Sequence, residues 1–102
     1  MRKHIYFTLT LMLLLPTAIL AHNIIKGKVI DQNSNTPLPG ASILLSGTSE
    51  GCTTDEWGNF IIYTDYESGT LIISFLGYES KEIEFTSHTE FLVIELNQDI
   101  VD

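Results

Sequence analysis

Short runs in which apolar and smaller or polar residues alternate fill the chain from residue 22 onward. In residues 41–46, for example, Ala41, Ile43 and Leu45 recur at the period of two that is typical of a β-strand. Residues 70–76 are almost wholly apolar, which predicts a central strand. The pattern predicts strands at residues 24–31, 41–46, 51–54, 60–64, 70–76, 79–85 and 91–96. Seven short strands separated by frequent turns, with no helical period, predict an all-β sandwich.

The first of these strands shows which face should point to the core. Ile25, Gly27 and Val29 share one face, and Lys26 and Lys28 share the other. Because successive side chains of a strand point to opposite sides, the lysines are expected in solvent and the isoleucine and valine inside.

Proline and glycine mark the turns. Pro37 and Pro39 restrict φ and donate no backbone hydrogen bond, so they are expected to flank a turn and not to lie in a central strand. Gly40 follows them where the chain reverses. A second turn is expected at residues 55–58, since Asp55 can bond to its own backbone and Gly58 can adopt a positive φ.

The first 21 residues have the features of a secretory signal peptide. A basic start at residues 1–4 precedes an apolar run at residues 5–15, and Pro16 breaks the run before a cleavage site after Ala21. A membrane anchor is the alternative, but spanning requires about 17–25 apolar residues. The sequence therefore predicts a signal peptide at 1–21, one domain at 22–97 and a C-terminal tail at 98–102.

The mature chain is strongly acidic. Removing Arg2 and Lys3 leaves three lysines against 13 acidic residues, a formal charge of −10. Such a surface disfavours nucleic acid and anionic lipid as partners, and no membrane insertion of the mature domain is expected. The single cysteine, Cys52, excludes an internal disulfide. It is expected as a half-buried structural residue in a loop whose neighbouring acids raise the thiol pKa.

Five segments resemble, in order, the carboxypeptidase-regulatory-like (transthyretin-like) β-sandwich family. They are Gly27-Lys28-Val29-Ile30-Asp31, residues 37–43 (PLPGASI), Gly47-Thr48, residues 54–60 (TDEWGNF) and residues 74–78 (SFLGY). The structural motif residues implied by this resemblance are Gly27, Asp31, Pro37, Pro39, Gly40, Ala41, Gly47, Thr54, Asp55, Gly58, Phe60, Gly77 and Tyr78. The resemblance implies a seven-stranded Greek-key sandwich of the transthyretin/prealbumin type.

The same resemblance suggests what the domain does. Such sandwiches are found at the N-terminus of SusC/RagA-type TonB-dependent outer-membrane transporters of Bacteroidetes. It implies a non-catalytic, exported module in the periplasm, with no cofactor, whose partner is the plug and barrel of a transporter or another periplasmic protein. The alternative is a free-standing exported binding module for a carbohydrate or a protein. In that case Trp57, Tyr63 and Tyr66 are candidates for a sugar platform.

Three patterns resemble chemical sites, but each has a simpler interpretation. Residues 47–51 match G-x-S-x-G, with Asp65 and His88 following in the order of a hydrolase triad, yet that motif requires a strand–turn–helix on a large α/β sheet. Residues 31–35 match the opening of a calcium loop that lacks its glycine and its bidentate glutamate. A copper site at His22 with His88 would need a spatial coincidence. No catalytic or metal-binding residue is therefore assigned.

Overall fold

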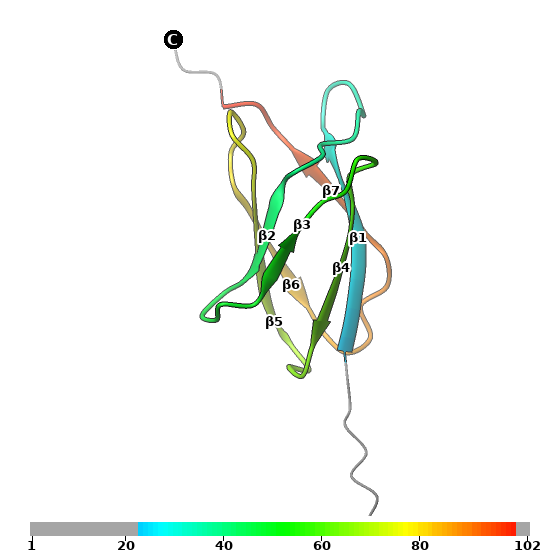
Figure 1. Cartoon of the computed structure of the whole chain (residues 1–102), viewed down its shortest axis with the longest axis vertical. Helices are drawn as coiled ribbons and strands as arrows, with labels where there is room; N and C mark the ends of the chain where they lie inside the picture. The colour runs from blue at the N-terminus through cyan, green and yellow to red at the C-terminus, as the bar shows by residue number, and fades with distance from the viewer. Residues whose placement is uncertain (1–22, 100–102) are drawn as a thin grey trace, which may run out of the picture.

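The strands of the chain form two facing sheets (Figure 1). The structure, a computed structural model, describes residues 23–99. Its strands are β1 (Asn23–Asp31), β2 (Ser42–Leu45), β3 (Gly51–Thr53), β4 (Asn59–Thr64), β5 (Gly69–Ser74), β6 (Lys81–Phe85) and β7 (Leu92–Leu96). All seven predicted strands are present, and their boundaries differ from the prediction by no more than two residues.

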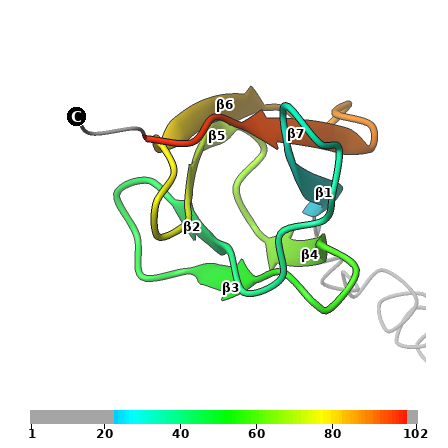
Figure 2. The same ribbon diagram turned by 90° about the horizontal axis from the view of Figure 1, so that it is seen from above.

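The strand order gives a Greek-key arrangement. The first sheet has the order β4-β1-β7 and the second has the order β3-β2-β5-β6. After the β2–β3 hairpin the chain returns to the first sheet, where β4 pairs antiparallel with β1. The last strand, β7, pairs parallel with β1. Seen end-on, the strands surround the space between the two sheets (Figure 2). The predicted seven-stranded all-β sandwich is confirmed.

The core lies between the two sheets and follows the period-two pattern. Ile25 and Val29 of β1 point inward, as predicted, and are at most 1% exposed. Burying such a side chain contributes about 1.5–3 kcal/mol. The core cluster consists of Ile25, Val29, Leu38, Ala41, Ile43, Leu45, Phe60, Ile62, Leu71, Ile73, Phe85, Ile94 and Leu96. Both sheets supply it, so the sandwich is held by side chains from all its strands except β3.

The predicted strand at residues 70–76 is central, as expected, but it ends earlier. It lies between β2 and β6 and stops at Ser74. The backbone N–H of Tyr78 donates to the carbonyl of Phe75 at 3.0 Å, and Gly77 has a φ of +87°, so the chain reverses there. Leu76 consequently lies in the turn with 95% of its surface exposed. Its hydrophobic character alone indicated a strand, and that extension was wrong.

The predicted signal peptide at residues 1–21, with its cleavage site after Ala21, lies outside the described residues. So do His22 and residues 100–102 of the predicted tail. In residues 23–99 there is no helix with the length and apolar character needed to cross a membrane.

Candidate functional site

Most of the motif residues lie in the turns at one end of the sandwich, the end at which β1 finishes. Figure 1 shows the loops after β1, between β3 and β4, and between β5 and β6 together at this end. The exceptions are Gly27 in β1, Phe60 opposite it in β4, and Gly47 in the β2–β3 loop at the other end. This end of the molecule is called the motif end below, and its contacts decide whether the motifs perform chemistry or hold the fold.

Asp31, the last residue of β1, is hydrogen-bonded to three other segments at the motif end. Its Oδ1 accepts hydrogen bonds from the backbone N–H groups of Asn33 and Ser34 at 2.8 and 3.0 Å. Its Oδ2 accepts from the Tyr78 hydroxyl at 2.5 Å and from the Gln98 side-chain amide at 3.4 Å. The side chain is buried, with 4% of its surface exposed. The carboxylate therefore ties the loop after β1 to the β5–β6 turn and to the segment after β7.

These contacts change the acidity of both partners. The Tyr78 hydroxyl, followed by the Ser34 N–H, lowers the pKa of Asp31 to about 2. The pKa of Tyr78 is raised, chiefly because its proton is held by Asp31. Both groups are therefore fixed in their ordinary neutral-pH forms, Asp31 as a carboxylate and Tyr78 as a phenol. A pair with such pKa values is suited to holding structure and not to transferring protons.

A pH titration tests this pair. Because the folded pKa of Asp31 is depressed, its stabilisation is complete above about pH 4 and is lost as the pH falls towards about 2. Because the folded pKa of Tyr78 is raised, its stabilisation is complete below about pH 10 and is lost at higher pH. We expect Tyr78→Phe to lower Tm at pH 7 and to flatten the Tm profile on both sides. An unchanged profile, measured by circular dichroism, would contradict the assigned contact.

The calcium-like pattern at residues 31–35 forms a hydrogen-bonded turn. Both oxygens of Asp31 already accept from protein donors, and Asn35, with a φ of +59°, donates its N–H to the Asp31 carbonyl at 2.8 Å. Across residues 23–99 there is no group of three or more His, Cys, Asp or Glu side chains placed to hold a metal ion. The polar residues of this loop are explained by the turn they form.

The buried hydroxyl of Thr54 links the turn that contains Pro39 to the β3–β4 turn. The Oγ1 atom donates to the carbonyl of Leu38 at 2.5 Å and accepts from the N–H of Ala41 at 2.8 Å. The backbone of Thr54 also donates to the Ala41 carbonyl and accepts from the Gly40 N–H, at 2.9 and 3.1 Å. The turn that contains Pro39 is thereby attached to the start of the β3–β4 turn.

Asp55 and Gly58 form the β3–β4 turn, as the sequence predicted. Asp55 Oδ1 accepts from the N–H groups of Trp57 and Asn59, both at 2.9 Å. Gly58 has a φ of +77°, and its carbonyl accepts from the Val29 N–H at 2.8 Å. The turn therefore lies directly against β1, and only a residue without a side chain fits there.

Gly27 and Phe60 form a contact between β1 and β4, where their Cα atoms are partners. A Cβ atom added at Gly27 would lie 2.6 Å from a ring carbon of Phe60 and 2.7 Å from the carbonyl oxygen of Leu92. The aromatic ring thus covers the glycine in the core. The remaining motif glycines, Gly40, Gly47 and Gly77, all have positive φ in turns.

The hydrolase-like residues are not brought together. Residues 47–50 lie in the loop of the β2–β3 hairpin and Gly51 begins β3; the Thr48 hydroxyl donates to the Leu45 carbonyl at 2.8 Å. Figure 1 shows this loop and the β6–β7 loop, which carries His88, on opposite sides of the molecule. Ser49 therefore does not have His88 beside it, and the strand–turn–strand context is not that of a nucleophile elbow.

The three aromatic residues considered as a sugar platform do not form one surface. Trp57 lies in the β3–β4 turn, whereas Tyr66 lies in the β4–β5 turn at the other end of the sandwich (Figure 1). Tyr63 lies on β4 between them. Each is exposed, but Trp57 and Tyr66 lie too far apart to contact one sugar together.

Cys52 differs from its prediction in its position and in the physical cause of its raised thiol pKa. It lies in β3, not in a loop, and it is half-buried against the core. Burial raises the pKa of its thiol, and a hydrogen bond with the backbone of Ile61 partly opposes the shift. The cause is thus desolvation and not neighbouring acidic residues, although the outcome, a poorly nucleophilic structural thiol, is the predicted one.

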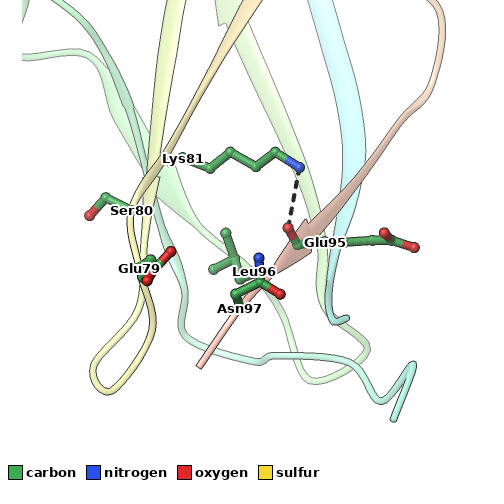
Figure 3. Close-up of a pocket in the computed structure, with 6 residues that line it drawn as sticks. All are labelled: Glu79, Ser80, Lys81, Glu95, Leu96 and Asn97. Atoms are coloured by element: carbon green, nitrogen blue, oxygen red, sulfur yellow. Dashed lines mark hydrogen bonds between the residues drawn. The ribbon is translucent and has the colours of Figure 1, made fainter. Parts of the chain in front are cut away.

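A small polar cavity lies where the edges of β6 and β7 meet, and no sequence pattern indicated it. Its volume is about 150 Å³, and it is lined by Glu79, Ser80, Lys81, Glu95, Leu96 and Asn97. Figure 3 shows the Lys81 ammonium donating to the Glu95 carbonyl, at 3.3 Å. Ligand pockets for small molecules usually enclose about 300–1,000 Å³. The cavity lies between two strand edges and is smaller than most sites for small-molecule ligands.

Comparisons with known proteins agree with this description of a structural module. The chain is 30% identical over 70 residues, 69% of its length, to "TonB-dependent receptor P3" of Formosa agariphila. The match spans only 7% of that receptor.

A crystal structure of a Coh3ScaB–XDoc_M2ScaA type II cohesin–X–dockerin complex from Acetivibrio cellulolyticus contains a chain of similar fold. The TM-score is 0.55 at 24% identity, with 72% of this chain and 56% of that chain covered. The profile of the CarboxypepD_reg-like domain matches residues 25–102. This chain therefore belongs to the CarboxypepD_reg-like domain family.

Proposed function

We propose that this domain is a non-catalytic accessory module of a TonB-dependent outer-membrane transporter, located in the periplasm ahead of the plug. The likeness to a segment of a TonB-dependent receptor is the observation that carries the proposal. In this proposal residues 1–21 direct export, residues 22–97 form the module, and the transporter's plug and barrel, or another periplasmic protein, are its partners. The domain itself binds no cofactor.

The use of polar side chains at the motif end supports a structural role. The side chains of Asp31, Thr54 and Asp55 all accept or donate hydrogen bonds within the domain. Their contacts fix turns, and the motif carboxylates Asp31 and Asp55 are occupied by these hydrogen bonds. What the module offers a partner is therefore its rigid outer surface, which includes an open hollow of about 510 Å³ beside the β5–β6 turn.

The position of the last described residues suggests how the module could act on a plug. Asn23 begins β1 at one end of the sandwich, and residues 97–99 lie at the motif end (Figure 1). The Asp99 N–H donates to the Gly77 carbonyl at 2.8 Å, and Gln98 forms a β-bridge with Tyr78. A plug following this segment would be attached to a rigid body, so a force on one would be transmitted to the other.

Fractionation of the native cells tests the proposal. An antibody raised against the mature domain should detect a protein much larger than the 11.4 kDa of this chain in the outer-membrane fraction. A small protein found only in the soluble periplasmic fraction would contradict the proposal and favour a free-standing binding module. Purified mature chain and its Ser49→Ala variant should show equal, background hydrolysis of a generic ester.

A further inference from the structure

The outer face of the first sheet carries four exposed apolar side chains, on all three of its strands. Ile24, Ile61, Tyr63 and Val93 have 46%, 46%, 65% and 61% of their surface exposed. Ile24 is opposite Tyr63 in the β1–β4 register. Side chains in such cross-strand positions lie about 5 Å apart and touch, so the two form one apolar surface in place of two isolated residues. The largest apolar patch on a monomer is typically about 300–600 Å² and is often functional.

Two lysines lie within this group. Lys26 is opposite Ile61 on β4, and Lys28 is opposite Val93 on β7. No ion pair joins either lysine to another residue in the part of the chain that the structure describes. The four apolar residues with Lys26 and Lys28 are called the lysine face below.

This face is more basic than the rest of the domain, although the exposed Glu95 of β7 lies on the same side, two residues from Val93. The mature chain has three lysines against 13 acidic residues, and two of the three lysines are here. The outer face of the second sheet instead presents Glu82 and Glu84 of β6, opposite Ile72 and Thr70 of β5. Two cations that find no carboxylate within a domain so rich in carboxylates are available to an external acidic group.

We propose that the lysine face docks an acidic segment of a partner protein, in which carboxylates alternate with aliphatic side chains. The carboxylates would pair with Lys26 and Lys28, and the aliphatic side chains would cover Ile24, Ile61 and Val93. This inference rests on the proposed function, because it names the surface through which the module meets its periplasmic partner.

The dimensions of the face indicate a transient contact. Three strands about 4.8 Å apart, each contributing about six residues at about 3.3 Å per residue, give roughly 300 Å² of sheet. Stable complexes bury about 800 Å² on each partner. A face of this size, steered by charge, suits a contact that forms and dissociates during a transport cycle. Three of its four apolar side chains are aliphatic and only Tyr63 is aromatic, which favours a protein over a sugar, because sugars stack on aromatic rings.

Site-specific photo-crosslinking in the native cells tests the proposal. A photoreactive residue placed at Val93 should give an adduct with a periplasmic or outer-membrane protein. Mass spectrometry should place the crosslink in a segment rich in Asp and Glu. The same residue at Leu44, which is 39% exposed on the outer face of the second sheet, is the matched control and should give at least fivefold less adduct. Adducts of equal yield at the two positions would overturn the proposal.

Charge reversal separates docking from chance proximity. Lys26→Glu should lower the Val93 adduct at least fivefold, whereas Lys81→Glu, which makes the same change in net charge on β6, should lower it less than twofold. Equal losses in the two variants, an adduct with a second copy of this chain, or an adduct with an anionic polysaccharide would each overturn the proposal. Circular dichroism should show both variants folded, since both lysines are exposed.

A peptide titration distinguishes failure of this inference from failure of the proposed function. The probe is a ten-residue peptide of alternating Glu and Val, added to the mature chain and followed by NMR, with a Lys–Val peptide as control. Shifts confined to β1, β4 and β7 that disappear at high salt support the lysine face even if the native protein is free in the periplasm. No shifts with the Glu–Val peptide would overturn the inference and leave the outer-membrane location intact.

Discussion

Gly58→Ala is expected to lower the free energy of unfolding by about 3 kcal/mol. Gly58 has a φ of +77°, where an L-residue is strained by about 1–2 kcal/mol. A Cβ atom there would also lie 2.7 Å from the carbonyl oxygen of Val29, so the turn would have to move away from β1. That movement would weaken the bond from the Val29 N–H to the Gly58 carbonyl. For a domain of this size we expect Tm, measured by calorimetry, to fall by about 15 °C.

Gly40→Ala is the matched control. Gly40 has a nearly identical φ of +81°, but a Cβ atom there would meet nothing within 4 Å. Only the backbone strain remains, so the expected loss is about 1 kcal/mol. Equal losses at the two glycines would show that the close approach of the β3–β4 turn to β1 is incorrectly described.

Gly27→Ala is expected to have a similarly large effect for a different reason. Its backbone is extended within β1, but a Cβ atom would lie 2.6 Å from the ring of Phe60 and 2.7 Å from the Leu92 carbonyl oxygen. Overpacking of this kind costs about 1–3 kcal/mol, and the backbone contact leaves little room for relief, so we expect about 3 kcal/mol. Chemical denaturation in urea measures it. Lys28→Ala, which changes a neighbouring side chain on the outer face, should cost less than about 1 kcal/mol.

A double mutant locates the cause of that loss. Phe60→Leu removes the ring atoms that the new methyl group would meet, at its own cost of about 1–2 kcal/mol. The double variant Gly27→Ala/Phe60→Leu should therefore be more stable than the sum of the two single losses, by about 1 kcal/mol. Strict additivity would mean that the ring and the glycine are not in contact.

Turn chemistry explains why so much of the fold was predictable. Asp55 and Gly58 have local roles, a bond to the nearby backbone and a positive φ, and both can be recognised from sequence alone. The alternation at Ala41, Ile43 and Leu45 likewise requires no knowledge of the partner strand. Resemblance supplied what local patterns do not, namely which strands pair.

Features that depend on distant residues were not predictable. Asp31 meets Tyr78 across 47 positions of sequence, and only the fold brings them together. Leu76 was placed in a strand because hydrophobicity does not reveal where a turn begins. The lysine face is formed by three strands that are far apart in sequence, so its apolar and basic residues looked like ordinary solvent-facing positions. The apparent hydrolase triad failed for the same reason, because order along the chain does not determine proximity.

Deletion of the module from the native gene tests the proposed accessory role most directly. Residues 23–97 would be deleted while residues 1–22 and any downstream sequence are kept, and nutrient uptake would be compared with the amount of the proposed transporter's barrel in the outer membrane. An accessory module predicts a barrel present in normal amount with uptake reduced several-fold. Unchanged uptake per barrel would contradict an accessory role in transport.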